Sequence, residues 1–429
     1  MVHSRQELVI VDGIRTPFAS ANKELASLGA DELGYLAASH LLARHPDIAA
    51  KIEEVIFGCV GPDAAVSNIA RVIALRAGIS EKVPALTVQR NCASGMEALS
   101  QVFHRADRND DSAFLIGGTE SMSNYPFCYS DEMKALFSTL GRSKSMTGKL
   151  SALLTFRPRF LKPRIALLEG LTDPICGLSM GKTAENLARE FSISRGAQDA
   201  YSLRSHQRAA ASAEVLRKES FVTVTNNASV RDDTAVRPNQ NRDALARLRP
   251  VFTRSYGTVT AGNSCAVTDG AVALLAASPK LMTEKHEALG YVRDCVTVGL
   301  SPQRMGLGPV FAISKLLERN QLQLGDIELF EINEAFAAQV LACLSASKSK
   351  DFCQRELGRS SAMGEIPLEQ LNVNGGAIAL GHPVGASGAR IILTLLKEMK
   401  RRGAKRGIAA LCVGGGQGSA VLLERMEDK

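Results

Sequence analysis

The sequence predicts an α/β fold in which two duplicated halves, each built on a mixed sheet, are interrupted by an inserted domain. Strand-like and helical runs alternate along the first third of the chain, which is typical of strands joined by helical crossovers. The same order of elements recurs in the last third. Between the copies, the stretch from Asn124 to Arg254 has helical and polar segments without strand alternation.

The first copy is predicted from short β-branched apolar runs and from apolar residues spaced three or four positions apart. In chain order its elements are the strand Leu8–Val11, a helix through Leu33 to Leu41, the strand Val55–Val60, a short helix ending near Gly78, the strand Pro84–Val88, a helix through Met96 to Phe103, and the strand Ala113–Gly118.

The second copy repeats this order. Its elements are the strand Tyr291–Gly299, the helix Val310–Leu317, the strand Ile327–Ile332, the helix Ala335–Leu344, the short strand Leu371–Val373, the helix Ala386–Met399, the strand Gly407–Val413 and the closing strand Ser419–Leu423. The tripeptide Ala-Ser-Gly opens the matching helices at 93–95 and 386–388. That tripeptide is a common match by chance, so the order of elements around it is the better support for duplication.

The two copies differ after their glycine-ended strands. In the second copy the closing strand follows at once, whereas its counterpart Asp269–Leu275 comes about 130 residues later, and structureless loops of that length are rare. We therefore predict an N-terminal half of residues 1–123 plus 255–284, an inserted domain of residues 124–254, and a C-terminal half of residues 285–429. The insertion is well placed to cover a site.

The composition limits the classes of function. Nine cysteines without a C-x-x-C pair predict neither a zinc cluster nor a disulfide framework, and favour a reducing, cytoplasmic location. The absence of tryptophan argues against nucleic-acid binding, while a net charge of +7 leaves an anionic ligand open. No apolar stretch has the length of a membrane span, and the first strand begins too early for a signal peptide.

Cys92 lies where a predicted strand turns into a helix. At such a turn the free backbone N–H groups and the helix dipole favour a thiolate over a thiol, so we expect a nucleophile. The alternative is a small buried cysteine in a turn, since free cysteine is among the most buried residue types.

The second copy places His382 before the helix that mirrors the Cys92 helix, and Cys412 at the end of the following strand. If the halves pack about a pseudo-two-fold axis, these side chains meet Cys92 in one cleft. A histidine can activate a thiol there, and a second thiol can move a proton. The glycines from Gly414 onward leave N–H groups free for an oxyanion hole, or they simply end a strand, just as His382 alone can be a turn residue.

Asn333 lies where another predicted strand passes into a helix. An N-cap is one good explanation of an asparagine at this position. Its amide can equally hold a water or a carbonyl group in the same cleft.

Four motifs in this order resemble the active-site motifs of the thiolases, which cleave or form 3-ketoacyl-CoA. They lie at 91–95, 333–337, 381–388 and 412–416, and the resemblance spans nearly the whole chain. It implies a thiolase fold with a five-layered core. Coenzyme A is then a substrate, and neither a metal nor a permanently bound cofactor is implied.

The resemblance also implies a role for each motif residue. Cys92 is acylated by the substrate, His382 activates Cys92, and Cys412 moves the second proton. One oxyanion hole uses His382 with a water held by Asn333, and the other uses the N–H groups of Cys92 and Gly414.

Segments 177–185, 204–210 and 248–250 resemble the β-subunits of fatty-acid oxidation trifunctional complexes. This resemblance implies a degradative 3-ketoacyl-CoA thiolase and a hydratase/dehydrogenase α-subunit as partner. Contacts with CoA are expected from Met180, Ser264 and Cys265, the last standing where thiolases usually carry Ser or Thr.

Such β-subunits also carry an extra basic helical segment, which here is Arg142 to Arg164. It holds seven Lys or Arg, no acid, and apolar residues at helical spacing. An interfacial helix on anionic lipid fits this pattern. The alternative is a solvated basic face that covers the CoA phosphates.

Thiolases are generally dimers or tetramers, so a homo-oligomer is expected, and a homodimer would bury the face opposite the insertion. Three other functions remain open at this point. They are a short-chain acetyl-CoA acetyltransferase that works in the condensing direction, a condensing enzyme of the ketoacyl synthase type, and a non-catalytic acyl-CoA or lipid-binding protein.

Overall fold

The N-terminal half of the molecule follows the predicted alternation. The computed structural model describes residues 8–105, 111–283 and 287–425. The strands of this half are β1 (Leu8–Arg15), β2 (Ala19–Ser20), β3 (Ile52–Gly58), β4 (Ala85–Val88), β5 (Ala113–Ser121) and β10 (Thr268–Ala277). Its helices are α1 (Ala30–Leu42), α2 (Pro46–Ala49), α3 (Ile69–Arg76) and α4 (Ser94–Arg105).

The C-terminal half repeats these elements. Its strands are β11 (Gly290–Gly299), β12 (Leu329–Ile332), β13 (Arg406–Val413) and β14 (Gln417–Glu424). Its helices are α12 (Gly308–Asn320), α13 (Ala337–Lys348), α14 (Lys350–Leu357), α15 (Ala377–Leu380) and α16 (Val384–Arg402). Within the described residues, the strands of both halves join through β1 and β11 into one ten-stranded sheet of order β12-β13-β14-β11-β1-β10-β5-β3-β4, with β2 on β10.

Pairing directions confirm the duplication. The pairs β3–β5 and β12–β13 are parallel, and each is followed by an antiparallel pair, β5–β10 or β13–β14. The predicted strand Leu371–Val373, the counterpart of β4, is wrong, because only the single bridge Phe330–Leu371 forms there. Asn372 has a positive φ of 46° and its side-chain amide, not its backbone, exchanges hydrogen bonds with both backbone groups of Ile332, each 2.8 Å long.

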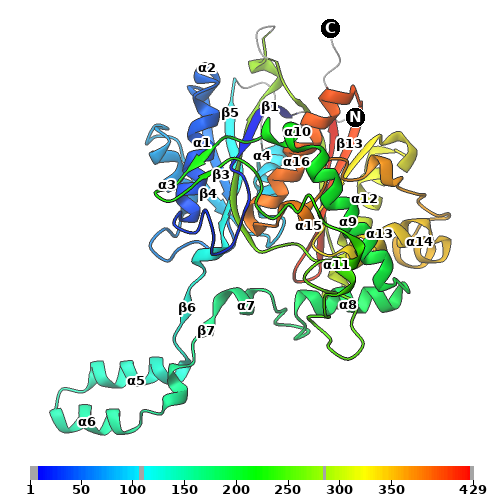
Figure 1. The fold of residues 1–429 in the computed structure, drawn as a ribbon. Helices are drawn as coiled ribbons and strands as arrows, with labels where there is room; N and C mark the ends of the chain where they lie inside the picture. The colour runs from blue at the N-terminus through cyan, green and yellow to red at the C-terminus, as the bar shows by residue number, and fades with distance from the viewer. Residues whose placement is uncertain (1–7, 106–110, 284–286, 426–429) are drawn as a thin grey trace.

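Five layers result from this arrangement (Figure 1). Helix α16 contacts β5 of one half and β13 of the other, and α4 packs on α16, so these two helices lie between the halves of the sheet. α1 and α12 pack on β10 and β14 respectively, and three apolar clusters fill the spaces between layers. This five-layered α/β architecture was predicted correctly.

The matched Ala-Ser-Gly motifs bring the central helices together. A Cβ atom on Gly95 would lie 2.8 Å from the backbone nitrogen of Ala389, and one on Gly388 would lie 2.5 Å from that of Met96. Neither position has room for a side chain. The duplicated glycines therefore let α4 and α16 cross with their backbones in contact.

The insertion is helical, with short two-stranded pairs. Its elements are β6 (Phe127–Cys128), α5 (Asp131–Arg142), α6 (Met146–Leu154), β7 (Arg164–Ile165), α7 (Ala166–Gly170), α8 (Met180–Glu190), α9 (Arg195–Ala211), α10 (Ala213–Arg217), β8 (Thr223–Val224), β9 (Ser229–Val230) and α11 (Arg242–Ala246). Helices α8 and α9 pack on α13 and α15 of the C-terminal half. In the described part of the chain no helix is long and apolar enough to cross a membrane.

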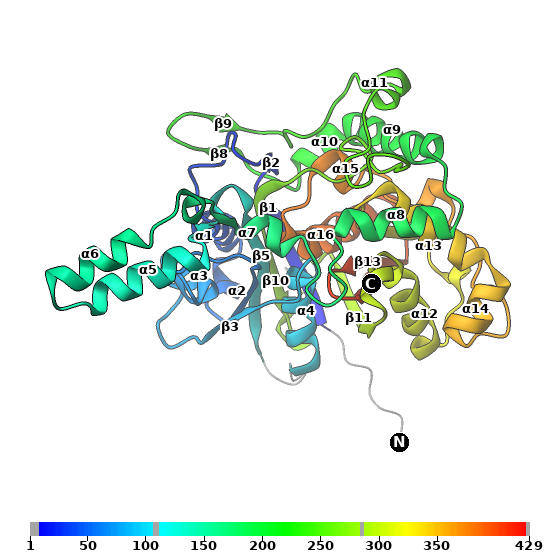
Figure 2. The same cartoon turned by 90° about the horizontal axis from the view of Figure 1, so that it is seen from below.

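Helices α5 and α6 form a hairpin that projects from the body on the β6–β7 pair (Figures 1 and 2). We call residues 127–165 the arm. The predicted basic helical segment Arg142 to Arg164 contains α6, which covers only Met146–Leu154, while α5 ends at Arg142. Ser145 caps α6 by accepting a hydrogen bond from the Gly148 N–H, and a 3-10 turn that begins at Pro158 leads into β7.

Candidate active site

Cys92 lies in the sharp turn between β4 and α4. Asn91 adopts a left-handed backbone with φ of 43°, a conformation that asparagine tolerates better than most residues. The Ser94 hydroxyl closes the turn by donating to the Asn91 carbonyl at 2.7 Å and accepting from the Arg90 N–H at 2.9 Å. The local sequence thus presents the Cys92 side chain at the tip of a rigid turn.

The expected thiolate is wrong for the free site. Burial raises the pKa of the Cys92 thiol to about 11, and the backbone N–H groups of Gly414 and of Cys92 itself oppose that shift only in part. Helix α4 begins two residues later, at Ser94, so its free N–H groups do not outweigh desolvation. The resting sulfur is a neutral thiol that needs a base.

His382 is the candidate for such a base. It is 5 % exposed, and its Nδ1 lies 2.6 Å from the Ser387 hydroxyl oxygen, which in turn donates to the Pro383 carbonyl at 3.0 Å. Because the hydroxyl has one proton, it accepts from Nδ1–H, which leaves Nε2 unprotonated. Burial, with a smaller contribution from Arg390, lowers the pKa of His382 to about 3.

Asn333 faces this histidine. Its Nδ2 lies 3.5 Å from His382 Nε2, and its Oδ1 is buried with no hydrogen-bond partner among the described residues. The N-cap explanation is wrong, because α13 begins at Ala337 with Phe336 as its cap. The Asn333 N–H instead extends the ladder of β12 by donating to Ala410 O at 2.9 Å. An unpartnered buried amide oxygen suits a bound water.

Cys412 is buried at the end of β13 and interacts electrostatically with Cys92, with Cys343 of the core helix α13, and with Cys265. Burial raises the pKa of Cys412 well above its ordinary value, and that of Cys265 to about 12. Thiols from three separate segments therefore meet in this site, as the pseudo-two-fold arrangement predicted for Cys92 and Cys412. Both remain protonated at neutral pH.

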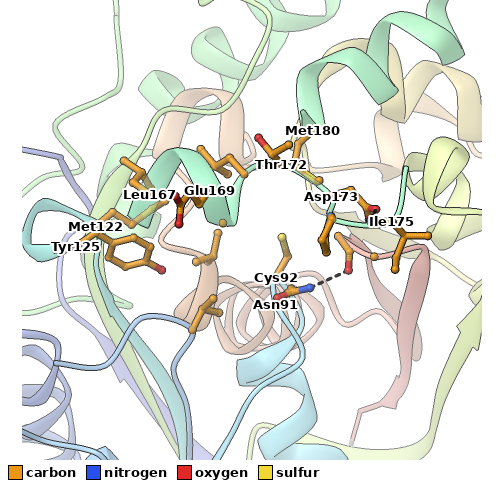
Figure 3. Close-up of a pocket in the computed structure, with 17 residues that line it drawn as sticks. Asn91, Cys92, Met122, Tyr125, Leu167, Glu169, Thr172, Asp173, Ile175 and Met180 are labelled. Atoms are coloured by element: carbon orange, nitrogen blue, oxygen red, sulfur yellow. Dashed lines mark hydrogen bonds between the residues drawn. The ribbon is translucent and has the colours of Figure 1, made fainter. Parts of the chain in front are cut away.

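A cavity of about 470 Å³ opens above Cys92, whose sulfur points into it (Figure 3). Segment 167–175 of the insertion forms its roof, as predicted for a domain that covers the site. The Asn91 side-chain amide donates to the Gly414 carbonyl at 2.8 Å along the floor (Figure 3). The lining residues are Val60, Asn91, Cys92, Met122, Tyr125, Leu167, Glu169, Gly170, Leu171, Thr172, Asp173, Pro174, Ile175, Met180, Val384, Gly414 and Gly415.

Comparison with known proteins agrees with this geometry. The family models for the thiolase N-terminal domain and the thiolase C-terminal domain match residues 8–280 and 286–425. The chain belongs to the thiolase family. It is therefore an acyltransferase by family.

Several relatives of this thiolase cover almost its whole length. The mitochondrial trifunctional enzyme subunit beta of Bos taurus is 36 % identical over 98 % of this chain and 88 % of its own length. The beta-ketoadipyl-CoA thiolase of Pseudomonas aeruginosa is 38 % identical over 98 % of this chain and all of its own length. The crystal structure of human mitochondrial 3-ketoacyl-CoA thiolase in complex with CoA superimposes with a TM-score of 0.83 at 33 % identity, covering 98 % of each chain.

The residues expected to contact CoA do not all line the cavity of this thiolase. Met180 lines the cavity, whereas Ser264 and Cys265 do not belong to its lining. The Ser264 hydroxyl donates to the Thr260 carbonyl at 2.7 Å. Cys265 instead interacts electrostatically with Cys92 and Cys412.

Two contributing residues of the thiolase site were missed from the sequence. Ser387 orients His382, and its position in the first turn of the following helix was the available signal. Asp173 accepts from the N–H groups of Ile175 and Cys176 at 2.8 and 2.9 Å. It thereby fixes the turn that forms part of the roof, and an Asp-Pro turn was the signal for it.

The buried neutral His382 predicts a pH dependence of stability. Between its folded pKa of about 3 and its ordinary value of 6.5, the unfolded chain takes up a proton that the folded thiolase does not. The free energy of unfolding therefore falls as pH decreases through this window. We expect the difference in melting midpoint, His382→Asn minus wild type, to become more positive between pH 7 and pH 4. A difference that is independent of pH would contradict the assignment of a neutral, buried imidazole.

Proposed function

We propose that this thiolase cleaves 3-ketoacyl-CoA with free CoA, releasing acetyl-CoA and a shortened acyl-CoA, by a ping-pong reaction in fatty-acid β-oxidation. The observation that carries the proposal is the apolar cavity directly above Cys92. Among its lining residues the polar groups are few, and none is Lys, Arg or His. Such a cavity suits an uncharged alkyl chain whose reacting end lies at the sulfur.

In the first half-reaction, His382 Nε2 takes the proton of Cys92 and the sulfur attacks the 3-keto carbon. The bond between C2 and C3 breaks, leaving an acyl thioester on Cys92 and the enolate of acetyl-CoA. Cys412 protonates that enolate at C2. A water on Asn333 together with His382 binds the thioester oxygen of the enolate.

In the second half-reaction, the thiol of free CoA gives its proton to the Cys412 thiolate and attacks the acyl group. The N–H groups of Cys92 and Gly414 stabilise the oxyanion, in keeping with their interaction with the Cys92 sulfur. The Cys92 thiolate leaves and recovers its proton from His382, so all groups return to their starting states. CoA is thus a substrate, bound with help from Met180 and, beyond the cavity, Ser264 and Cys265.

The same cavity argues against a dicarboxylic acyl chain. A 3-ketoadipyl group ends in a carboxylate, which needs a cation or several donors when it leaves water. Here two carboxylates, Glu169 and Asp173, belong to the lining instead. Repulsion between these carboxylates and the carboxylate of the acyl chain disfavours such a substrate.

Thiolysis assays test the proposed function. Short, medium and long 3-ketoacyl-CoA and 3-ketoadipyl-CoA are each mixed with free CoA, and loss of the magnesium-enolate absorbance is followed. We expect turnover of medium and long chains and none of 3-ketoadipyl-CoA. Turnover of acetoacetyl-CoA alone would make the protein a short-chain acetyltransferase, and no turnover would favour a binding protein.

The arm supports a further part of the proposal, peripheral contact with an anionic membrane. Its small core of Met133, Leu136 and Ala152 leaves other apolar side chains in solvent. On α6, Met146, Leu150 and Leu154 are 80, 61 and 73 % exposed. Each basic side chain near an anionic surface contributes about 1 kcal/mol, and residues 142–164 carry seven.

We expect full-length protein to sediment with phosphatidylglycerol vesicles and much less with phosphatidylcholine vesicles. Leu150→Glu combined with Leu154→Glu should reduce the bound fraction by about tenfold or more, since each buried leucine contributes about 1.5 to 3 kcal/mol. Val224→Glu is the matched control, because Val224 is 67 % exposed on β8, outside the arm. Equal binding by all three proteins would favour the solvated basic face.

Assembly is also proposed. The edge strand β4 and its neighbour α3 expose Leu86 and Leu75, 39 and 42 % accessible, which supports a homodimer or tetramer built on this edge. The similarity to a trifunctional enzyme subunit beta supports a hydratase/dehydrogenase α-subunit as an additional partner. We propose a cytoplasmic location on the cysteine usage alone.

A further inference from the structure

A buried carboxylate without a cation lies beside the active site. Glu120, near the end of β5, has no exposed surface. It accepts from the N–H groups of Val60, Gly61 and Gly385 at 3.0, 2.9 and 2.9 Å, and from the Tyr125 hydroxyl at 3.0 Å. Among the described residues, no lysine, arginine or histidine donates a hydrogen bond to Glu120. Desolvating a carboxylate is costly, so such a group is retained where its hydrogen bonds have a specific use.

The donor set favours the ionised form. Both carboxylate oxygens receive backbone N–H groups, which can only donate, and the Cys59 thiol lies 3.7 Å from Oε1. Burial acts in the opposite direction and raises the pKa of Glu120, while the N–H groups and the Tyr125 hydroxyl lower it.

One oxygen of Glu120 joins the two halves of the molecule. Oε2 accepts from Val60, which follows β3, and from Gly385, which lies 265 residues along the chain in the first turn of α16. The first N–H groups of a helix have no partner within the helix, so Glu120 caps α16 from the opposite half. A Cβ on Gly385 would lie 2.7 Å from Oε2, which leaves no room for a side chain.

The capped turn carries the catalytic histidine. His382 precedes α16 by two residues, and Ser387 in the same first turn holds its Nδ1. Val60 and Tyr125, which also bond to Glu120, line the cavity above Cys92. We propose that Glu120 is a positioning residue that fixes the start of α16, and with it His382, against the Cys92 half of the active site.

The negative charge of Glu120 affects the pKa of the Cys92 thiol. Its field contributes to the raised pKa of the Cys92 thiol. Removal of the charge should therefore make Cys92 ionise at lower pH even though catalysis fails. This titration reports the charge of Glu120 beside Cys92, whereas the split between kcat and KM and the charge-retaining variant Glu120→Asp report its positioning of His382.

The test uses the full-length enzyme and Glu120→Gln. The amide keeps the size of the side chain but directs an NH₂ group at backbone N–H donors. We expect the kcat of thiolysis to fall by about 100-fold, as a displacement of about 1 Å can cause, with a much smaller change in the KM for CoA. The pH midpoint for alkylation of Cys92 by iodoacetamide, followed by peptide mapping, should shift downward by roughly half a unit or more.

Glu398→Gln is the matched control, because Glu398 is a buried carboxylate near the other end of α16 that pairs with Arg401 and Arg402. It should lower the melting midpoint without moving the Cys92 titration. Wild-type turnover in Glu120→Gln, or a loss of turnover that comes from KM with kcat unchanged, would overturn the positioning role.

Glu120→Asp covers the case in which Glu120→Gln does not fold. It keeps the charge but withdraws it by one methylene, so turnover should fall while the Cys92 titration stays close to that of wild type. Wild-type turnover of Glu120→Asp would then overturn the proposal. Only the kcat measurement in this test rests on the proposed thiolysis. If the wild type cleaves no 3-ketoacyl-CoA, the proposed function fails while the alkylation comparison still tests Glu120.

Discussion

Replacing Cys92 by alanine should lower thiolysis by roughly 10⁴-fold or more while leaving CoA binding largely intact. The sulfur lies at the tip of the turn between β4 and α4 and points into the cavity (Figure 3). Without it no acyl-enzyme can form, because desolvation raises the pKa of the other two thiols, Cys412 and Cys265, and keeps them protonated. The turn itself is held by Ser94 and by the Asn91 backbone, neither of which needs the thiol.

Two measurements check this result. Steady-state thiolysis gives the loss of turnover, and calorimetric titration with CoA reports whether the binding surface is preserved. Mass spectrometry of the wild type after incubation with acyl-CoA should place one acyl group on the Cys92 peptide, and Cys92→Ala should carry none. Substantial turnover by the alanine variant would remove Cys92 from its role. Acylation elsewhere would point to another nucleophile.

Replacing Cys412 by alanine should separate the two kinds of chemistry in the site. Cys412 is 1 % exposed and burial raises the pKa of its thiol well above the ordinary value, so it can donate a proton at neutral pH. Cleavage and condensation both move a proton at C2, and loss of a general acid or base costs about 10²- to 10⁴-fold. Acyl transfer from acyl-CoA to Cys92 moves no proton at carbon. The CoA thiolate leaves readily, because an ordinary thiol has a pKa of about 8.5, so acylation should persist without a proton from Cys412.

The decisive comparison is therefore acyl-enzyme formation against thiolysis in the same preparation of Cys412→Ala. Cys295→Ala is the matched control, because Cys295 is also a buried thiol, 3 % exposed, but lies on β11 in the central core. It should keep both activities. Near-normal cleavage by Cys412→Ala would contradict the assignment of Cys412 as the proton-transfer group. If acylation of Cys92 were lost as well, Cys412 would instead be needed to support the nucleophile.

Short-range patterns predicted much of this protein. Apolar spacing located most strands and the main helices within a few residues, because burial of one face imposes its period on the sequence. The repeated order of elements predicted the duplication, and four motifs identified the family and the residues that meet in the site. Where the prediction of a strand failed, at Leu371–Val373, a single side chain was responsible, since the Asn372 amide replaces a ladder of backbone bonds.

The arm shows a different limit. Composition predicted a basic, amphipathic segment, but not that α5 and α6 would fold into a hairpin away from the body (Figure 2). The partner of α6 is α5, outside the basic segment, and their shared core includes Met133 and Ala152. Pairing of this kind depends on which apolar faces meet in space, and spacing within one segment does not reveal it.

Thus the sequence by itself determined the order of elements, the duplicated architecture and the family, and with the family the candidate site residues. Only the tertiary structure decided their chemical state. The raised pKa of Cys92, the tautomer of His382 and the hydrogen bonds of the buried Glu120 all depend on desolvation and on donors from distant segments, such as the Gly385 N–H. Solvent exclusion and hydrogen bonding act through space, so they are set only when the two halves close around α4 and α16.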